Sequence, residues 1–153
     1  MKVLIDVGIS QKELSMRLKQ IDRNPENLDG IFMTHEHSDH LKGIGPLARK
    51  FGVPVYSTMG SYEAAKKKVG KVEDWRYFKP LDRIVINDLE IESYPTPHDA
   101  ADPVGFVARC NGFTLGQATD LGCLTPIVLE KMAAADALLI EANHDVEMLE
   151  VGP

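Results

Sequence analysis

Three of the five histidines of the chain, together with two carboxylates, fall within residues 34–40. A folded core has little use for so many polar groups at one place unless something pairs them. Neutral imidazole and carboxylate are ligands that suit zinc, with histidine nitrogens at roughly 2.0–2.1 Å from the metal. The ordinary alternatives are titrating surface histidines and an acidic residue placed favourably at a helix start. The density of the cluster favours a metal site.

The flanking residues indicate that this cluster lies on a turn between a strand and a helix. Residues 30–34 form a short, partly β-branched apolar run, which is typical of a buried strand. After the cluster, apolar residues recur at helical spacing and end at a glycine suited to a helix C-cap: Leu41, Ile44, Leu47, Ala48 and Phe51. His35 and His37, two apart in an extended segment, should project to the same side. Asp39 and His40 open the helix and can point back toward them.

The motif His-x-His-x-Asp-His after an apolar strand resembles the signature of the metallo-β-lactamase fold superfamily. Residues 32–45, with residues 141–145, are similar to the YycJ-type bacterial branch, whose members are regarded as double-stranded DNA exonucleases. The resemblance covers nearly all of residues 1–153. It implies the α/β fold of that superfamily, an αβ/βα sandwich, as a single partial domain. We expect the domain to be incomplete at both ends, without a first loop between two strands and without later strands and helices.

The resemblance also implies the ligands of two metal ions: His35, His37 and His98 for the first, Asp39 and His40 for the second, and Asp120 as the carboxylate that bridges them. Without the resemblance, His98 would be interpreted as an ordinary loop histidine, and Asp120 as an ordinary turn residue before a glycine. Asp6 would support the metal-binding turn by hydrogen bonding, or simply begin a turn. An Asp at position 120, where many true β-lactamases have a Cys ligand, favours the phosphodiesterase and thioesterase branches.

The chemistry so implied is that of a zinc-dependent hydrolase, of the phosphodiesterase or 5′–3′ DNA exonuclease type. Its nucleophile would be a metal-bound hydroxide held between two zinc ions, or manganese or iron in their place, with Asp39 and Asp120 at the reacting centre. His144 would either protonate the leaving oxygen or be a surface histidine. The alternatives are a small-molecule thioester or lactam hydrolase and an inactive metal-binding fragment, because a further histidine of the second site is expected beyond the chain.

Composition and charge set limits on these interpretations. With 153 residues and 44% hydrophobic side chains, the chain should form one globular domain. No apolar run reaches membrane-spanning length and the first residues do not form a signal peptide, so we expect a cytoplasmic protein that makes no membrane contact. The two cysteines, Cys110 and Cys123, are too few and too distant for a disulfide framework or a cysteine-rich zinc site.

A net charge of −6 is unusual for a protein whose expected partner is DNA or another phosphodiester, because lysine and arginine normally bind phosphates. Bound zinc would add positive charge locally. The one basic run is formed by Lys66, Lys67, Lys68 and Lys71. Such a run is more often a solvated helix face than a nucleic-acid patch, and both interpretations stay open.

The rest of the chain alternates predicted strands and helices. The predicted strands cover residues 3–8, 53–56 and 137–141, and two hairpins pair 83–86 with 89–93 and 104–110 with 113–117. One helix should begin at Ser10, a second should cover residues 61–69, and a third should begin after Thr125. The first and last strands are continuous apolar runs, which predicts burial on both faces. We expect any uncovered apolar face to associate with a second copy of the chain.

Overall fold

The computed structural model of the chain describes residues 1–141 and 145–151. The strands are β1 (Val3–Ile5), β2 (Gly30–Phe32), β3 (Val55–Thr58), β4 (Trp75–Phe78), β5 (Arg83–Ile86), β6 (Leu89–Pro95), β7 (Val104–Cys110), β8 (Phe113–Ala118) and β9 (Ala137–Ile140). The helices are α1 (Gln11–Gln20), α2 (Ser38–Leu41), α3 (Ile44–Phe51), α4 (Met59–Val69), α5 (Pro126–Ala133) and α6 (Val146–Val151), with a short 3₁₀ helix η1 (Pro25–Asn27).

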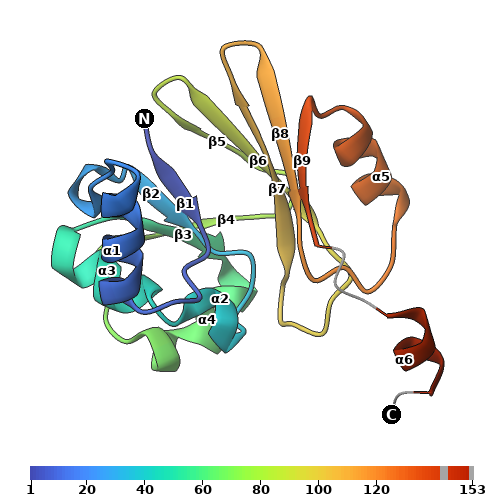
Figure 1. Cartoon of the computed structure of the whole chain (residues 1–153), viewed down its shortest axis with the longest axis horizontal. Helices are drawn as coiled ribbons and strands as arrows, with labels where there is room; N and C mark the ends of the chain where they lie inside the picture. The colour runs from blue at the N-terminus through green and yellow to red at the C-terminus, as the bar shows by residue number, and fades with distance from the viewer. Residues whose placement is uncertain (142–144, 152–153) are drawn as a thin grey trace.

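Two sheets pack against each other between two layers of helices (Figure 1). The first sheet has the order β1-β2-β3-β4 and is entirely parallel. The second has the order β5-β6-β7-β8-β9, antiparallel except for the parallel pair of β8 and β9. Helices α1 to α4 lie on the outer side of the first sheet and α5 on that of the second (Figure 1). The predicted αβ/βα sandwich is therefore confirmed.

Aromatic side chains fill the space between the two sheets. Phe32 on β2 stacks on Tyr56 of β3, with ring centroids 4.6 Å apart, and meets the ring of Phe106 on β7 edge to plane at 5.6 Å. Ile91 and Phe78 belong to the same buried cluster. Because these rings interlock across the sheets, the ends of the strands on one sheet are held in a defined position relative to those on the other.

Local sequence signals account for most of the elements. Ser10 and Thr125 cap α1 and α5 by accepting hydrogen bonds from the backbone N–H groups of Glu13 and Val128. The two hairpins form as predicted, and Asn87 and Asn111 occupy their turns with positive φ values of 54° and 51°. Asparagine adopts this left-handed conformation more readily than most residues do, so the turn chemistry agrees with the fold.

The structure corrects several predictions in the first half of the chain. The single helix expected after the histidine cluster is two helices, α2 and α3, because the backbone N–H of Gly43 donates to the carbonyl of Val7 at 2.8 Å in place of a carbonyl of the preceding helical turn. Ile21, which continues the helical spacing of the apolar residues Leu14 and Leu18, is exposed at the end of α1. Strand β4 was not predicted. Strand β3 begins after Pro54 and is internal to its sheet, so this proline marks a strand start and not an edge.

The prediction that the last strand is buried on both faces is wrong. Leu138, Leu139 and Ile140 of β9 are 49%, 59% and 45% exposed. The physical reason is that β9 forms the edge of its sheet and pairs only with β8 among the strands that the structure describes. Strand β1 is likewise an edge strand and is only half-buried. Helix α6 was not predicted.

Cys110 and Cys123 are both free thiols. Within residues 1–141 and 145–151, no helix is long and apolar enough to cross a membrane.

A buried ion-pair network fastens α5 to the second sheet. The carboxylate of Glu92 on β6 accepts hydrogen bonds from Lys131 of α5 at 2.8 Å and from Arg109 of β7 at 2.7 Å. Burial acts to raise the pKa of Glu92, but the hydrogen bonds and charges of Lys131 and Arg109 outweigh burial and lower it. The ionised carboxylate therefore stabilises the fold at neutral pH.

We expect Glu92→Gln to lower the free energy of unfolding by about 1–3 kcal/mol at pH 7, because it removes the charge that Lys131 and Arg109 share. A lowered pKa gives stability above the ordinary glutamate pKa that is lost as the pH falls, so the difference should shrink below about pH 4. Urea unfolding at several pH values measures this difference. Glu90→Gln, at a more exposed position, is the matched control, and equal losses for the two variants would contradict the assignment.

Candidate metal centre

The histidine cluster lies at the carboxyl ends of two neighbouring parallel strands. Ile5 of β1 pairs with Phe32 of β2, so Asp6 and Thr34, which follow these strands, reach the same edge of the sheet. Asp6 adopts a positive φ of 57°, and its backbone N–H donates to the carbonyl of Phe32 at 2.8 Å. This unusual backbone conformation directs the Asp6 carboxylate toward the cluster.

The Asp6 carboxylate orients two imidazoles. Its Oδ1 accepts from the backbone N–H of Thr34 at 2.8 Å, and its Oδ2 accepts from the Thr34 hydroxyl at 2.7 Å and from Nδ1 of His40 at 2.9 Å. Because the Thr34 hydroxyl gives its proton to Asp6, its oxygen accepts from Nδ1 of His35, 2.9 Å away. Both histidines therefore carry a proton on Nδ1, which leaves the Nε2 lone pairs free to bind a cation.

Three histidines converge as the first predicted ligand set. His35, His37 and His98 offer ring nitrogens that all lie within 4.8 Å of one another. Nδ1 of His37 and Nε2 of His98 are 3.1 Å apart, while Nδ1 of His98 faces the carboxylate of Asp99 at 3.1 Å. Two nitrogens bound to one tetrahedral zinc would be separated by about 3.3 Å. The three side chains are thus arranged as one metal site requires.

A second group consists of His35, His40 and Asp120, again within 4.8 Å. Nε2 of His40 lies 3.2 Å from Oδ2 of Asp120 and 3.6 Å from Oδ2 of Asp39. Asp39 lies beside His40, and its side chain is 77% exposed. Five of the six predicted ligands therefore belong to the two groups, with the buried His35 common to both, while Asp39, predicted for the second site, lies outside them.

Burial and neighbouring charges set the protonation of the two central histidines. Burial, together with the charge of the nearby His40, lowers the pKa of His35 to about 4, so His35 is neutral near pH 7. Burial also opposes the charged form of His40, yet the hydrogen bond and charge of Asp6, with the charges of Asp120 and Asp39, raise its pKa. The carboxylates around His40 thus favour a positive charge at this place. A cation bound beside Asp120 would supply that charge.

Asp120 reaches the site from the second sheet. It follows β8 with a positive φ of 54°, and its backbone N–H donates to Oε2 of Glu141, after β9, at 2.6 Å. The N–H of Gly122 donates to the carbonyl of Pro97 at 2.8 Å, which joins this turn to the loop that carries His98. This positioning role of Glu141 was not predicted from the sequence. The signal that could have identified Glu141 is its place directly after a strand, β9, that runs parallel to β8.

Two contacts hold the metal-binding loop, residues 33–40, against the segment after β1 and the loop after His98. An added Cβ at Gly8 would lie 1.6 Å from the carbonyl oxygen of Asp39, so only glycine allows this approach. Oε1 of Glu36 accepts from the backbone N–H of Ala101 at 2.8 Å, on the loop after His98. The histidine ligands from the two sheets are thereby held on backbone segments that contact each other.

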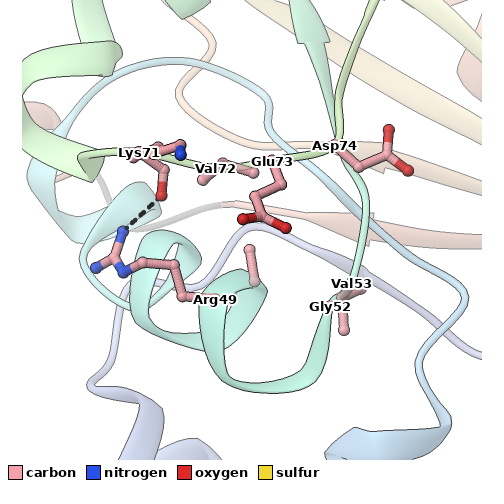
Figure 2. Close-up of a pocket in the computed structure, with 8 residues that line it drawn as sticks. Arg49, Gly52, Val53, Lys71, Val72, Glu73 and Asp74 are labelled. Atoms are coloured by element: carbon pink, nitrogen blue, oxygen red, sulfur yellow. Dashed lines mark hydrogen bonds between the residues drawn. The ribbon is translucent and has the colours of Figure 1, made fainter.

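A pocket of about 250 Å³ between the end of α3 and the loop before β4 is lined by Arg49 and Glu73 but by none of the predicted ligands (Figure 2). His144, the predicted proton donor, lies outside the residues that the structure describes.

Residues 1–152 match the family described as the beta-lactamase superfamily domain. The chain belongs to the metallo-β-lactamase superfamily. Exodeoxyribonuclease YycJ of Bacillus anthracis is 38% identical to it over 153 residues, and exodeoxyribonuclease WalJ of Streptococcus pneumoniae is 40% identical over 157 residues. Each alignment covers 99% of this chain and 58% of the relative. The chain thus spans less than two thirds of the length of these relatives.

Solved structures of metallo-β-lactamases have the same fold. The Cronobacter sakazakii metallo-β-lactamase with the HARLDQ motif has a TM-score of 0.72 at 15% identity, covering 90% of this chain and 68% of its own. MIM-2 metallo-β-lactamase has a TM-score of 0.70 at 19% identity, covering 90% and 64%. Identities this low show the fold alone.

The superfamily implies a divalent metal, and the side chains of this metallo-β-lactamase-like centre fit one. Nε2 of His35 and Oδ2 of Asp120 are buried and have no hydrogen-bond partner among the described residues. A buried polar atom without a partner costs free energy, and here both atoms belong to the converging groups. A cation at this place would satisfy both of them.

We expect Asp6→Asn to weaken zinc binding by about 10–100-fold, although Asp6 itself does not contact the metal. The amide loses the charge that favours the His40 orientation and one of the acceptors used by Thr34. Competition titration against a zinc chelator measures the affinity. Asp29→Asn, which alters a surface carboxylate bonded to the N–H of Lys2, is the control. Unchanged affinity in Asp6→Asn, with both proteins folded, would refute the orienting role.

Proposed function

We propose that this chain carries the metal centre of a zinc-dependent phosphodiesterase of the exodeoxyribonuclease type. The observation that carries the proposal is the convergence of four histidines and Asp120 in a chain 38–40% identical to proteins named exodeoxyribonuclease. The aspartate at position 120, where many β-lactamases use cysteine, supports phosphodiester chemistry over lactam hydrolysis.

We propose two zinc ions, with manganese or iron as alternatives. His35, His37 and His98 would hold the first, Asp39 and His40 the second, and Asp120 would bridge them; the histidine and carboxylate donors suit zinc. When bound, zinc supplies Lewis acidity and lowers the pKa of water to roughly 7, which provides a nucleophile at neutral pH.

The residues of the chain orient the reaction. Asp6 keeps the Nδ1 proton on His40, and through Thr34 it keeps the Nδ1 proton on His35, so neither Nε2 is blocked by a proton of the wrong tautomer. Glu141 holds the backbone of Asp120, whose Oδ2 is buried beside His40. The exposed carboxylate of Asp39 lies 3.6 Å from Nε2 of His40, where it would add a negative charge to the second metal site. Such positioning is a major part of hydrolytic catalysis.

A small-molecule thioester hydrolase is the second candidate. Hydroxyacylglutathione hydrolase of Brucella ovis is 31% identical over 86 residues, which cover 56% of this chain and 31% of that relative. The shorter alignment makes this candidate weaker than the exonuclease. Rates on a thioester and on a phosphodiester under the same zinc concentration discriminate between them.

If the two-metal centre assembles in this chain, it should slowly hydrolyse a generic phosphodiester with a good leaving group, because that reaction needs few substrate contacts. Asp120→Ala should abolish this hydrolysis and reduce bound zinc from about two equivalents to one, because the first site keeps its three histidines. Metal analysis and a chromogenic phosphodiester assay measure both effects. Asp136→Ala, on the loop before β9, is a control that should keep both metals.

Full activity in Asp120→Ala, or faster cleavage of a cephalosporin than of the phosphodiester, would contradict the proposal. Processive digestion of duplex DNA should be weak in this chain alone, since it spans 58% of the relatives named as exonucleases.

We also propose that a second copy of the chain covers the exposed edge strand β9. Its half-exposed residues Leu138, Leu139 and Ile140 present apolar side chains on a strand that ends its sheet among the described residues, an arrangement that favours strand pairing. Sedimentation equilibrium should show dimers, and Leu139→Lys should shift the protein toward monomers. A wild-type monomer across a wide concentration range would refute this association.

A further inference from the structure

A groove of about 530 Å³ lies between α4 and β4, on a part of the fold that supplies none of the predicted metal ligands. Three aromatic side chains line it: Tyr62 from α4, with Trp75 and Tyr77 from β4. The ring of Tyr62 meets those of Trp75 and Tyr77 at centroid distances of 4.9 and 5.0 Å. Tyr77 is 46% exposed, so one face of this aromatic group is open to solvent. The groove therefore offers an aromatic surface to solvent.

The same groove gathers positive charge in a protein whose net charge is −6. Lys66, Lys67 and Lys71 line it together with the aromatic residues. Lys66 pairs with Glu63, whereas Lys67 and Lys71 form no ion pair with any residue that the structure describes. Glu73 is the one carboxylate that lines the groove. Lys67 and Lys71, whose charge Glu73 offsets only in part, are thus left to attract an anion beside the aromatic rings.

The groove is built on fixed elements. The indole N–H of Trp75 donates to Oγ of Ser57 at 2.8 Å, which holds the ring on the sheet. The loop that carries Lys71 is held by Arg49, whose guanidinium donates to the carbonyl of Val69 at 2.9 Å. The same guanidinium donates to the carbonyl of Lys71 at 3.1 Å (Figure 2). A preformed surface of this kind loses little conformational entropy when it binds a ligand.

Helix α4 joins this groove to the metal centre. The side chain of Lys68, next to the groove residue Lys67, reaches the carbonyl oxygen of Glu36, 3.4 Å away, and Glu36 stands between the ligand residues His35 and His37. A ligand that continues from the groove along α4 therefore passes a fourth lysine, Lys68, before it reaches the metal-binding loop.

We propose that this groove binds a single-stranded segment of nucleic acid, with bases stacked against Tyr77 and Trp75 and backbone phosphates on Lys67 and Lys71. Aromatic platforms beside basic side chains are how proteins bind single strands without reading their sequence. The choice of ligand rests on the proposed nuclease function. The basic run of residues 66–71 then has a role beyond that of a solvated helix face.

The single tryptophan of the chain makes the binding directly observable, because a base stacked on Trp75 quenches its fluorescence. The zinc-loaded chain is titrated with a phosphorothioate dodecathymidylate, which resists hydrolysis. We expect saturable quenching and an affinity that falls as salt rises. Lys67→Glu with Lys71→Glu should weaken binding by about tenfold or more. Lys12→Glu with Lys19→Glu, the same change of charge on α1, should stay within about twofold.

The aromatic contact has its own variants. Tyr77→Ala should weaken binding by about fivefold or more, while Tyr77→Phe, which keeps the ring, should bind as the wild type does. Circular dichroism checks that each variant is folded. Equal losses in the two lysine pairs, binding by anisotropy without quenching of Trp75, equal quenching by polyglutamate, or no binding would each overturn the proposal.

The assay separates this proposal from the proposed function. Saturable quenching in a protein that hydrolyses no phosphodiester would support the groove and refute the nuclease. Hydrolysis of a generic phosphodiester with no oligonucleotide binding at Trp75 would refute the groove and leave the metal chemistry standing.

Discussion

The geometry of the metal centre depends on the hydrogen bonds that the carboxylate of Asp6 accepts. This carboxylate is a single acceptor group that binds the Thr34 backbone, the Thr34 hydroxyl and the His40 imidazole, and through Thr34 it sets the tautomer of His35. It can do so only because its backbone is left-handed and because Gly8 allows the metal-binding loop to approach. The strain of that backbone is offset by four polar groups that would otherwise be poorly oriented.

The sandwich supplies the remaining geometry. Parallel strands deliver Asp6 and the histidine loop to one edge of the first sheet, while His98 and Asp120 come from loops of the second sheet. The interlocked aromatic layer fixes the two sheets relative to each other, so ligands from separate sheets meet within 4.8 Å. On the outer side of the second sheet, the buried Glu92 network holds α5 in position by bonding Lys131. The rigidity of the packed layers is thus part of the metal site.

Net charge is a poor guide to what such a protein binds. The excess of carboxylates over basic side chains is a sum over the whole chain, whereas a ligand responds to the charges within about a Debye length of its site. Lys67 and Lys71 lie beside aromatic rings, and Lys68 contacts the metal-binding loop. The local arrangement is therefore basic in a protein that is acidic overall.

The sequence by itself determined the family, the layered α/β fold, the ligand candidates and most helix starts and hairpin turns, because these depend on motifs and on neighbours in the chain. Only the tertiary structure decided that β9 is an exposed edge, that Gly43 divides the helix after the cluster, and that Glu141 supports Asp120. It also decided that the lysines of α4 adjoin the aromatic residues of the unpredicted β4. An apolar run has the same local pattern at the edge as in the middle of a sheet, and contacts between distant residues arise from packing, which no local pattern encodes.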